Sequence, residues 1–388
     1  MIFGSEDKEE KTYLIFDIGS NSVAGSWVRY SSDKRPVILF TKHISIEVYQ
    51  EITAEHLLFA VKNAMREVLA VLLAQSLGAP ERAFVFVSSP WYAAQVRTLS
   101  YAKRHPFIFT KDFADGLVQK EFEKFNKGEH KEWKGMHTGH TSLEHRIMHV
   151  ELNGYTYRDP IGKKAERAEI VSFMSMMPTD VRDELERIIH GGFHVDVEFH
   201  SAIFASYFGL SHMEDMPSDY TILDIRGETT DLLVIHNRHI QEVVSIPFGD
   251  HTVVRSFAQL MNQKPVHMQE LLAMYTEGHL DDTNTAVIES HLSKAIEHVE
   301  KLLHNALVHV AERGLLPKNV YVYMQEEYKD WYAQILTDSK LSSVVVSDQS
   351  FSIHDARAVL KGLVTDEEVV LNPFIVAGAF FAQGKLSE

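Results

Sequence analysis

Two segments, one in each half of the chain, share a pattern that any proposed fold has to accommodate. In each, an apolar, β-prone run ends in an aspartate, a short polar turn with a glycine follows, and a second apolar run returns. The first unit runs through residues 17–22 and the second through residues 224–231. Apolar runs on either side of such a turn are typical of β-hairpins. The same strand–turn–strand unit is therefore predicted twice.

Between and after these hairpins, strand-like runs alternate with helical patterns. One helix is predicted from Thr53, a suitable N-cap, to Gly78, and a longer one over residues 286–313. Strands that alternate with long helices predict an α/β architecture in which helices cover the sheets. Residues 127–145 are polar and rich in glycine and histidine, so we expect a long surface loop there.

Length and composition exclude several classes of protein. The 388 residues, at roughly 150 per domain, predict two or three domains. Because the chain has no cysteine, disulfides, thiolate metal sites and cysteine catalysis are excluded, in agreement with a reducing compartment.

Charge and hydropathy bear on the partners. The net charge of −16 repels nucleic-acid phosphates, and no Lys/Arg cluster interleaved with aromatics stands out. The N-terminal residues have no apolar signal region, and the longest apolar runs are too short to span a bilayer. We therefore expect a cytoplasmic protein that binds no nucleic acid.

The two turns have the chemistry of phosphate-binding loops. Small residues let backbone N–H groups approach phosphate oxygens, and hydroxyl side chains add donors. An aspartate at the strand end can hold a hydrated Mg²⁺ through water, which is the role we expect for Asp17 and Asp224. Either turn alone also fits an ordinary hairpin, so the pair is the specific signal.

The residues of the two turns resemble the first and second phosphate motifs of the actin-like ATPase superfamily. Within that superfamily, three further segments look like the FtsA-type cell-division protein. They are residues 153–164, residues 192–196 and Ile246-Pro247-Phe248-Gly249. The PilM-type proteins of type IV pilus assembly share that fold. The match covers residues 12–382 and implies two lobes of duplicated ribonuclease-H-like architecture with an inserted small α+β subdomain.

The resemblance implies a division of the chain into segments. We expect a disordered N-terminal tail, a first lobe in two pieces, an inserted SHS2-like subdomain, a second lobe, and a C-terminal helix that returns to the first lobe. The tail is expected at residues 1–11, the first lobe at 12–78 and 169–212, and the inserted subdomain at 79–168. The second lobe is expected at residues 218–370 and the C-terminal helix at 371–388.

By the same resemblance, the nucleotide contacts come from both turns and from two later positions. These residues are Asp17, Gly19, Ser20, Asn21 and Ser22; Asp224, Arg226, Gly227, Glu228, Thr229, Thr230 and Asp231; and Glu270 and Gln325. The family has a residue that orients the attacking water, and its position aligns with Ser201 or, if the alignment shifts by one residue, with His200. No other catalytic residue is assigned.

The sequence departs from the family pattern at several of these positions. Arg226 and Glu228 stand where the second turn usually has glycines, and Gln325 begins the segment where a Gly-Gly pair should contact the base. A helix after the second hairpin keeps its glutamate, Glu270, but Ala273 takes the place of the lysine. Arg226 either blocks the phosphate or supplies a compensating charge, and the sequence leaves both open.

The resemblance implies an actin-like, ATP-binding cytoplasmic scaffold of bacterial cell division, with ATP and Mg²⁺ as cofactors and weak or absent hydrolysis. It would polymerise or recruit partners at the inner face of the membrane. The alternatives are a PilM-like platform protein that binds a partner peptide, a nucleotide-free pseudo-ATPase scaffold, and a phosphotransferase of the same fold. The implied partners are a tubulin-like division protein or a pilus membrane-protein peptide, together with other copies of the chain. We expect the membrane to be reached only through a partner, since no basic amphipathic tail is found.

Overall fold

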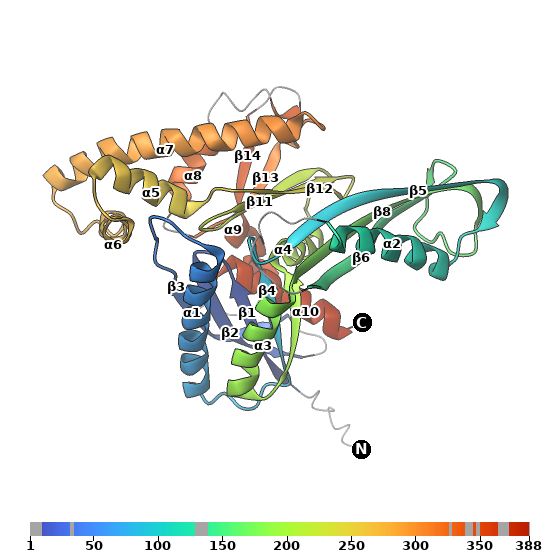
Figure 1. Cartoon of the computed structure of the whole chain (residues 1–388), viewed down its shortest axis with the longest axis horizontal. Coiled ribbons are helices and arrows are strands. Elements are labelled where there is room, and N and C mark those ends of the chain that lie inside the picture. Colours follow the sequence, from blue (N-terminus) through green and yellow to red (C-terminus); the bar gives the residue numbers. More distant parts are fainter. Residues whose placement is uncertain are drawn as a thin grey trace, which may run out of the picture.

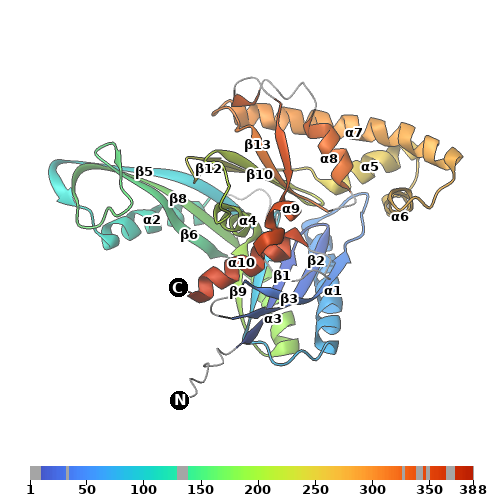
Figure 2. The same ribbon diagram turned by 180° about the vertical axis from the view of Figure 1, so that it is seen from behind.

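The computed structural model describes residues 10–31, 35–128, 139–325, 328–337, 344–346, 350–363 and 372–387. Within them the chain forms three β-sheets, two of five strands and one of four. Figures 1 and 2 show two helix-covered bodies and a long arm that projects from between them.

The first sheet has the strand order β3-β2-β1-β4-β9. Its strands are β1 (Lys11–Ile18), β2 (Ser22–Tyr30), β3 (Val37–Ser45), β4 (Arg82–Val87) and β9 (Asp196–Ser201). The first three pair antiparallel, whereas β4 lies parallel to both β1 and β9. Helices α1 (Ala54–Ala74) and α3 (Thr179–Phe193) pack together on one face. We call this sheet with its helices the first lobe.

The second sheet repeats this plan, with the order β12-β11-β10-β13-β14. Its strands are β10 (Tyr220–Ile225), β11 (Thr230–His236), β12 (His239–Ile246), β13 (Asn319–Tyr323) and β14 (Ser352–Asp355). Again three strands pair antiparallel and two add in parallel. Because both sheets share order and direction, the duplicated two-lobe architecture predicted from the sequence is confirmed.

The helices that cover the second sheet all follow its hairpin in the chain. They are α5 (Asp250–Met261), α6 (Pro265–Thr276), α7 (Asp282–Ala311) and α8 (Lys329–Leu336). Apolar side chains of these helices form one core with alternate residues of the second sheet. This sheet and its helices are the second lobe.

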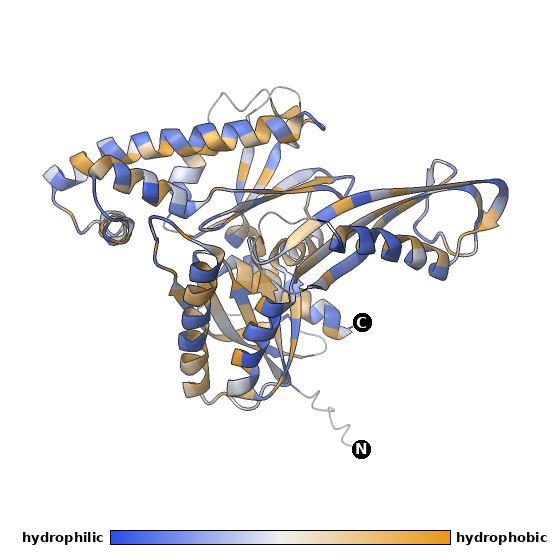
Figure 3. Ribbon diagram, viewed as in Figure 1, coloured by the Kyte–Doolittle hydropathy of each residue, from blue (hydrophilic) through white to orange (hydrophobic). Residues whose placement is uncertain are grey.

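A larger core joins the two lobes. It contains the apolar side chains of the first sheet, the other face of the second sheet, and the helices α4 (Ala202–Ser211), α9 (Ala356–Leu360) and α10 (Pro373–Ser387). A short 3₁₀ helix (Lys361–Leu363) follows α9. Helices α4 and α10 are apolar nearly all round, as a helix buried on every side requires (Figure 3).

The third sheet forms the arm, which we call the inserted subdomain. Its order is β5-β8-β6-β7, with β5 (Ala93–Ile108), β6 (His140–Leu152), β7 (Tyr155–Thr156) and β8 (Lys164–Pro178), covered by α2 (Lys111–Asn126). It lies between β4 and α3 in the sequence, so it is inserted into the first lobe.

Three expected limits differ from the observed elements. β4 belongs to the first sheet rather than to the segment 79–168, because it pairs with β1 and β9; conversely, β8 extends the inserted subdomain to Pro178. β6 begins at His140, inside the expected loop 127–145, because it pairs with β8 along its whole length. Of the expected tail, residues 1–9 lie outside the described residues, and Lys11 already belongs to β1.

A buried cluster of charges attaches the inserted subdomain to the first lobe. Glu144 on β6 accepts hydrogen bonds from the Ser201 hydroxyl (2.7 Å), and its other oxygen lies 3.1 Å from Nδ1 of His200. Nε2 of His200 lies 3.1 Å from Glu198. Burial opposes the charge on this imidazole, but the two carboxylates outweigh it and raise the pKa of His200.

We expect the folded state to lose stability as this imidazole deprotonates. Because the pKa of His200 is raised from 6.5, its stabilising charge is fully present below the unfolded value and is lost as the pH rises through the folded value. The difference in free energy of unfolding between the wild type and His200→Gln should therefore be largest at low pH and shrink upward. Urea unfolding from about pH 5 to about pH 8 measures it. A difference that stays constant, or one that the exposed control His56→Gln reproduces, would contradict this.

Candidate functional site

The two predicted turns meet between the lobes. The hydroxyl of Ser20 accepts a hydrogen bond from the backbone N–H of Glu228 (2.9 Å). The side-chain amide of Asn21 donates to Asp250 at the start of α5 (2.9 Å). The structure therefore brings together the turns of the first and second lobes, as the duplicated hairpins predict.

The space between the two strand-end aspartates is filled by an arginine of the second turn. Arg226 donates from Nη1 and Nη2 to the two oxygens of Asp17, at 2.8 and 2.9 Å. Its Nε donates to Asp224 at 2.6 Å. One guanidinium thus joins the ends of β1 and β10. We call Asp17, Arg226 and Asp224 the arginine bridge.

The arginine bridge is closed to solvent. Asp17 and Asp224 are 0% exposed and Arg226 is 1% exposed. The ring of Phe374, at the start of α10, covers the guanidinium with its centroid 3.4 Å from the central carbon. Burial raises the pKa of Asp224 to about 7 despite the arginine. Burial opposes the charge of Arg226, but the two aspartates outweigh it and raise its pKa.

Glycines make room for the arginine bridge. A Cβ atom on Gly19, in the first turn, would lie 3.1 Å from Nη1 of Arg226. A Cβ atom on Gly249 would lie 1.9 Å from the carbonyl oxygen of Arg226, which accepts a hydrogen bond from the N–H of Asp250 (2.8 Å). The Gly249 that the sequence singled out after Ile246-Pro247 therefore lets α5 approach the second turn.

The second unexpected residue of this turn, Glu228, also has partners. Arg255 on α5 binds both of its carboxylate oxygens, at 2.9 and 2.6 Å, and Nδ1 of His251 lies at 2.9 Å. Burial alone would raise the pKa of Glu228, but His251 and Arg255 lower it to about 2. Its negative charge is therefore neutralised within the second lobe. Neither Arg255 nor His251 was predicted, since no motif marks them.

Of the remaining predicted turn residues, Asp231 and Thr229 make contacts between the lobes. The carboxylate of Asp231 accepts hydrogen bonds from the hydroxyls of Ser89 (2.9 Å), Tyr92 (2.8 Å) and Ser245. Thr229 donates to the carbonyl of Ser89 in the loop after β4, and Ser22 donates to the side chain of Asn21 within the first turn. Within the second lobe, Thr230 donates to the carbonyl of Phe248, and the N–H of His251 donates to the carbonyl of Gly227.

These residues do not fit a magnesium polyphosphate. Mg²⁺ prefers carboxylate and water oxygens, yet both candidate aspartates accept hydrogen bonds from Arg226 and have no exposed surface. Across the described residues, no group of three or more histidine, aspartate or glutamate side chains is placed to hold a metal ion. A guanidinium occupies the place expected for ATP and Mg²⁺.

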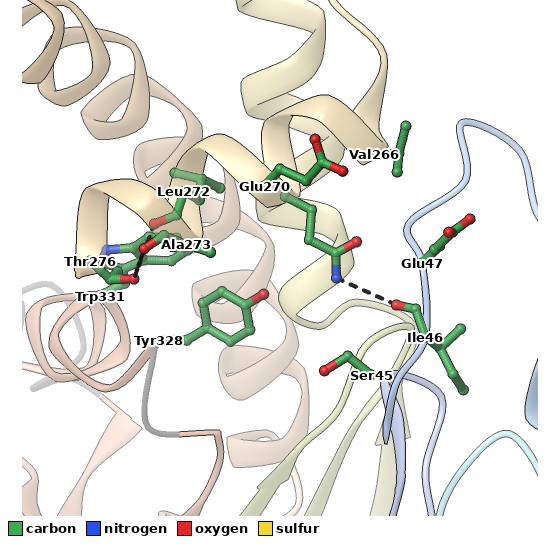
Figure 4. Close-up of a pocket in the computed structure, with 11 residues that line it drawn as sticks. Ser45, Ile46, Glu47, Val266, Glu270, Leu272, Ala273, Thr276, Tyr328 and Trp331 are labelled. Atoms are coloured by element: carbon green, nitrogen blue, oxygen red, sulfur yellow. Dashed lines mark hydrogen bonds between the residues drawn. The ribbon is translucent and has the colours of Figure 1, made fainter. Parts of the chain in front are cut away.

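A separate pocket lies beside the closed turns, between α6, the start of α8 and the segment after β3 (Figure 4). Its volume is about 310 Å³, at the small end for ligand sites. The side chain of Gln269 joins α6 to the first lobe by accepting from the N–H of Val48 (3.2 Å) and donating to the carbonyl of Ile46 (3.4 Å). The other lining residues are Ser45, Glu47, Val266, Glu270, Leu272, Ala273, Thr276, Tyr328 and Trp331.

The pocket has an acidic and aromatic lining. Glu47 and Glu270 contribute carboxylates, the ring centroids of Tyr328 and Trp331 lie 5.1 Å apart, and the described residues of the lining include no lysine or arginine. Of the two predicted nucleoside contacts, Glu270 lines the pocket and Gln325 does not. Like charges repel, so this lining disfavours a polyphosphate and favours a neutral or cationic group.

The residues at the expected place of the water-orienting group are engaged elsewhere. Ser201 donates its hydroxyl to Glu144, and His200 lies between Glu144 and Glu198. Both side chains are buried in the junction with the inserted subdomain. In this arrangement they fasten that subdomain to β9.

Comparisons with known proteins identify the fold. No protein-family model matches the sequence, and no curated protein matches it. A solved structure described as the PilM-PilN type IV pilus biogenesis complex is 13% identical, with a TM-score of 0.63, over 97% of this chain and 98% of that one. This chain has the actin-like ATPase fold.

Two further solved structures align less closely with this actin-like fold. The ethanolamine utilization protein EutJ from Carboxydothermus hydrogenoformans is 11% identical over 98% of this chain and 92% of that one, with a TM-score of 0.44. A Bacteroides thetaiotaomicron protein with an actin-like ATPase fold is 9% identical over 91% and 94%, with a TM-score of 0.38. Among the described helices, none is both long enough and apolar enough to cross a membrane.

We predict that removal of the guanidinium strongly destabilises the protein. Arg226→Met should lower the free energy of unfolding by about 3–5 kcal/mol, because two buried carboxylates lose their partner. The triple variant Asp17→Asn, Arg226→Met, Asp224→Asn should recover most of this loss, since no charge then remains at the three positions of the arginine bridge. Urea unfolding of both variants measures the effect.

The matched control is Arg66→Met on the exposed face of α1. It should change the free energy of unfolding by less than about 0.5 kcal/mol. An Arg226→Met protein as stable as the control would show that the arginine bridge contributes nothing.

Proposed function

We propose that this chain is an actin-fold scaffold that works without a nucleotide cycle and assembles protein partners at the inner face of the membrane. The arginine bridge is the observation that carries the proposal. Actin-like ATPases respond to a polyphosphate between their two turns, whereas here a side chain of the protein itself joins the turns. The proposal corresponds to the nucleotide-free scaffold among the alternatives left open by the sequence.

Several contacts support a permanently closed arrangement of the lobes. Arg226 binds Asp17, the N–H of Glu228 donates to Ser20, and Asp231 accepts from Ser89 and Tyr92. Asp17, Ser20, Arg226, Glu228 and Asp231 are among the residues expected to contact the nucleotide, and here they contact other residues of the chain. Because the protein supplies both partners of each contact, closure needs no ligand.

The partner is proposed from resemblance and from one comparison. The FtsA-like sequence features favour a tubulin-like division protein and self-association into polymers. The likeness to a PilM-PilN complex over nearly the whole chain supports a second candidate, a peptide of a pilus membrane protein. In that case the peptide would lie in extended form between the inserted subdomain and the first lobe.

The first experiment is calorimetric titration of the purified chain with ATP and Mg²⁺. We expect no binding at millimolar ATP, because the phosphate position is filled and the adjoining pocket is acidic. Sedimentation of the chain alone, with and without ATP, should show the same degree of self-association.

The variant Arg226→Gly restores a glycine to the second turn and tests the cause of the exclusion. It should bind ATP with Mg²⁺ more tightly than the wild type, whereas Arg255→Gly, which leaves the arginine bridge intact, should not. Micromolar binding of ATP by the wild type, lost in Asp224→Ala, would overturn the nucleotide-free proposal in favour of a working ATPase site.

A further inference from the structure

The far end of the inserted subdomain gathers basic residues from two segments. In β5 the pairing with β8 is interrupted after Ala102 and resumes at Phe107, so residues 103–106 bulge outward. The loop between β7 and β8 lies beside this bulge, since Ile108 pairs with Lys164 and the N–H of Gly162 donates to the carbonyl of Phe109 (2.8 Å). We call residues 101–111 and 153–166 together the arm tip.

The arm tip is basic in an acidic protein. It contains six basic residues and two acidic ones, against a net charge of −16 for the whole chain. The basic residues are Lys103, Arg104, Lys111, Arg158, Lys163 and Lys164. All six are exposed, and none forms an ion pair with another residue in the part of the chain that the structure describes. This cluster cannot be recognised from the sequence alone, because residues 101–111 and 153–166 become neighbours only through the pairing of β5 with β8.

Large apolar side chains are exposed at the same place. Tyr155 is 71% exposed, Ile108 is 55% exposed and Ile161 is 51% exposed. Tyr155 follows Gly154 and Ile161 precedes Gly162, and both glycines have positive φ, at 82° and 79°. Tyr155 begins the short edge strand β7, where it pairs with Leu152, and Ile161 lies in the loop between β7 and β8.

The loops of the arm tip are held in place. The side-chain oxygen of Asn153 accepts from the backbone N–H groups of Glu166 (2.9 Å) and Arg167 (3.0 Å), and the N–H of Phe109 donates to the carbonyl of Lys163 (2.9 Å). The exposed apolar side chains are therefore presented by fixed backbone, which lowers the entropy lost on binding. Figures 1 and 2 show that the arm tip is remote from both lobes, so it reaches a flat surface unobstructed.

We propose that the arm tip binds directly to an anionic membrane surface. Lysine and arginine are attracted to the negative surface potential of anionic lipids, and tyrosine and isoleucine enter the boundary between headgroups and acyl chains. The combination of exposed basic residues, which form no ion pair within the described residues, with exposed apolar side chains fits this partner better than nucleic acid, which offers no apolar layer. The inference departs from the expectation that the membrane is reached only through a partner.

Vesicle co-sedimentation of the full chain tests this inference. The wild type should bind phosphatidylcholine vesicles that contain phosphatidylglycerol, and added salt should weaken the binding. It should not bind vesicles that contain only phosphatidylcholine. The triple variant Lys103→Glu, Arg104→Glu, Lys163→Glu should bind at least about a hundredfold more weakly, at roughly fivefold for each basic residue. Tyr155→Ser with Ile161→Ser should also weaken binding, with little effect on its salt dependence.

The matched control reverses three exposed lysines elsewhere, as Lys294→Glu, Lys301→Glu and Lys318→Glu. It changes the net charge by the same amount as the arm-tip variant, and its vesicle affinity should stay within a few-fold of the wild type. All substituted positions are exposed, so circular dichroism and thermal unfolding should match the wild type. No binding to phosphatidylglycerol vesicles, an equal loss in the control, or binding of an oligonucleotide instead of vesicles would overturn the inference. Nucleotide-free scaffolding is measured separately by ATP titration, so failure of one leaves the other standing.

Discussion

The structure depends on a single cation placed between two carboxylates. Arg226 bonds to Asp17 at the end of β1 and to Asp224 at the end of β10, and the three groups are almost completely buried. Two aspartates this close would repel each other and pay a large desolvation cost without the guanidinium. The bidentate contact with Asp17 also fixes the orientation of one hairpin against the other. The contacts that hold the two turns together are therefore supplied by side chains of the protein itself.

A continuous apolar core reinforces this closure. Helices α4, α9 and α10 contribute to the same core as the first sheet and as one face of the second sheet. Phe374 on α10 covers the guanidinium, so the polar bridge and the apolar core share a residue. Separating the lobes would expose apolar side chains and break the arginine bridge at the same time, so both contributions add to the free energy of opening.

The sequence predicted what local patterns encode and missed what distant pairing decides. The two hairpins and their terminal aspartates were predictable, because alternating apolar runs and a polar turn are local signals. The role of Arg226 was not, since its partner Asp17 lies 209 residues away. Residues 140–145, the first part of β6, were taken for loop because they are polar, and the pairing of β6 with β8 supplies the stability that their composition does not. Of the residues that line the acidic pocket, the sequence marked only Glu270 and Ala273, and the other lining residues belong to no motif.

The duplicated hairpins have a consequence for how such sequences can diverge. Gly19 follows Asp17 by the same interval at which Arg226 follows Asp224, so the glycine and the arginine occupy corresponding places in the two copies. Gly19 borders the guanidinium, and a side chain there would crowd it. Only one copy can supply the central side chain while the other leaves space for it. A side chain larger than glycine at position 19 is therefore compatible with the fold only if the residue at position 226 is smaller than arginine.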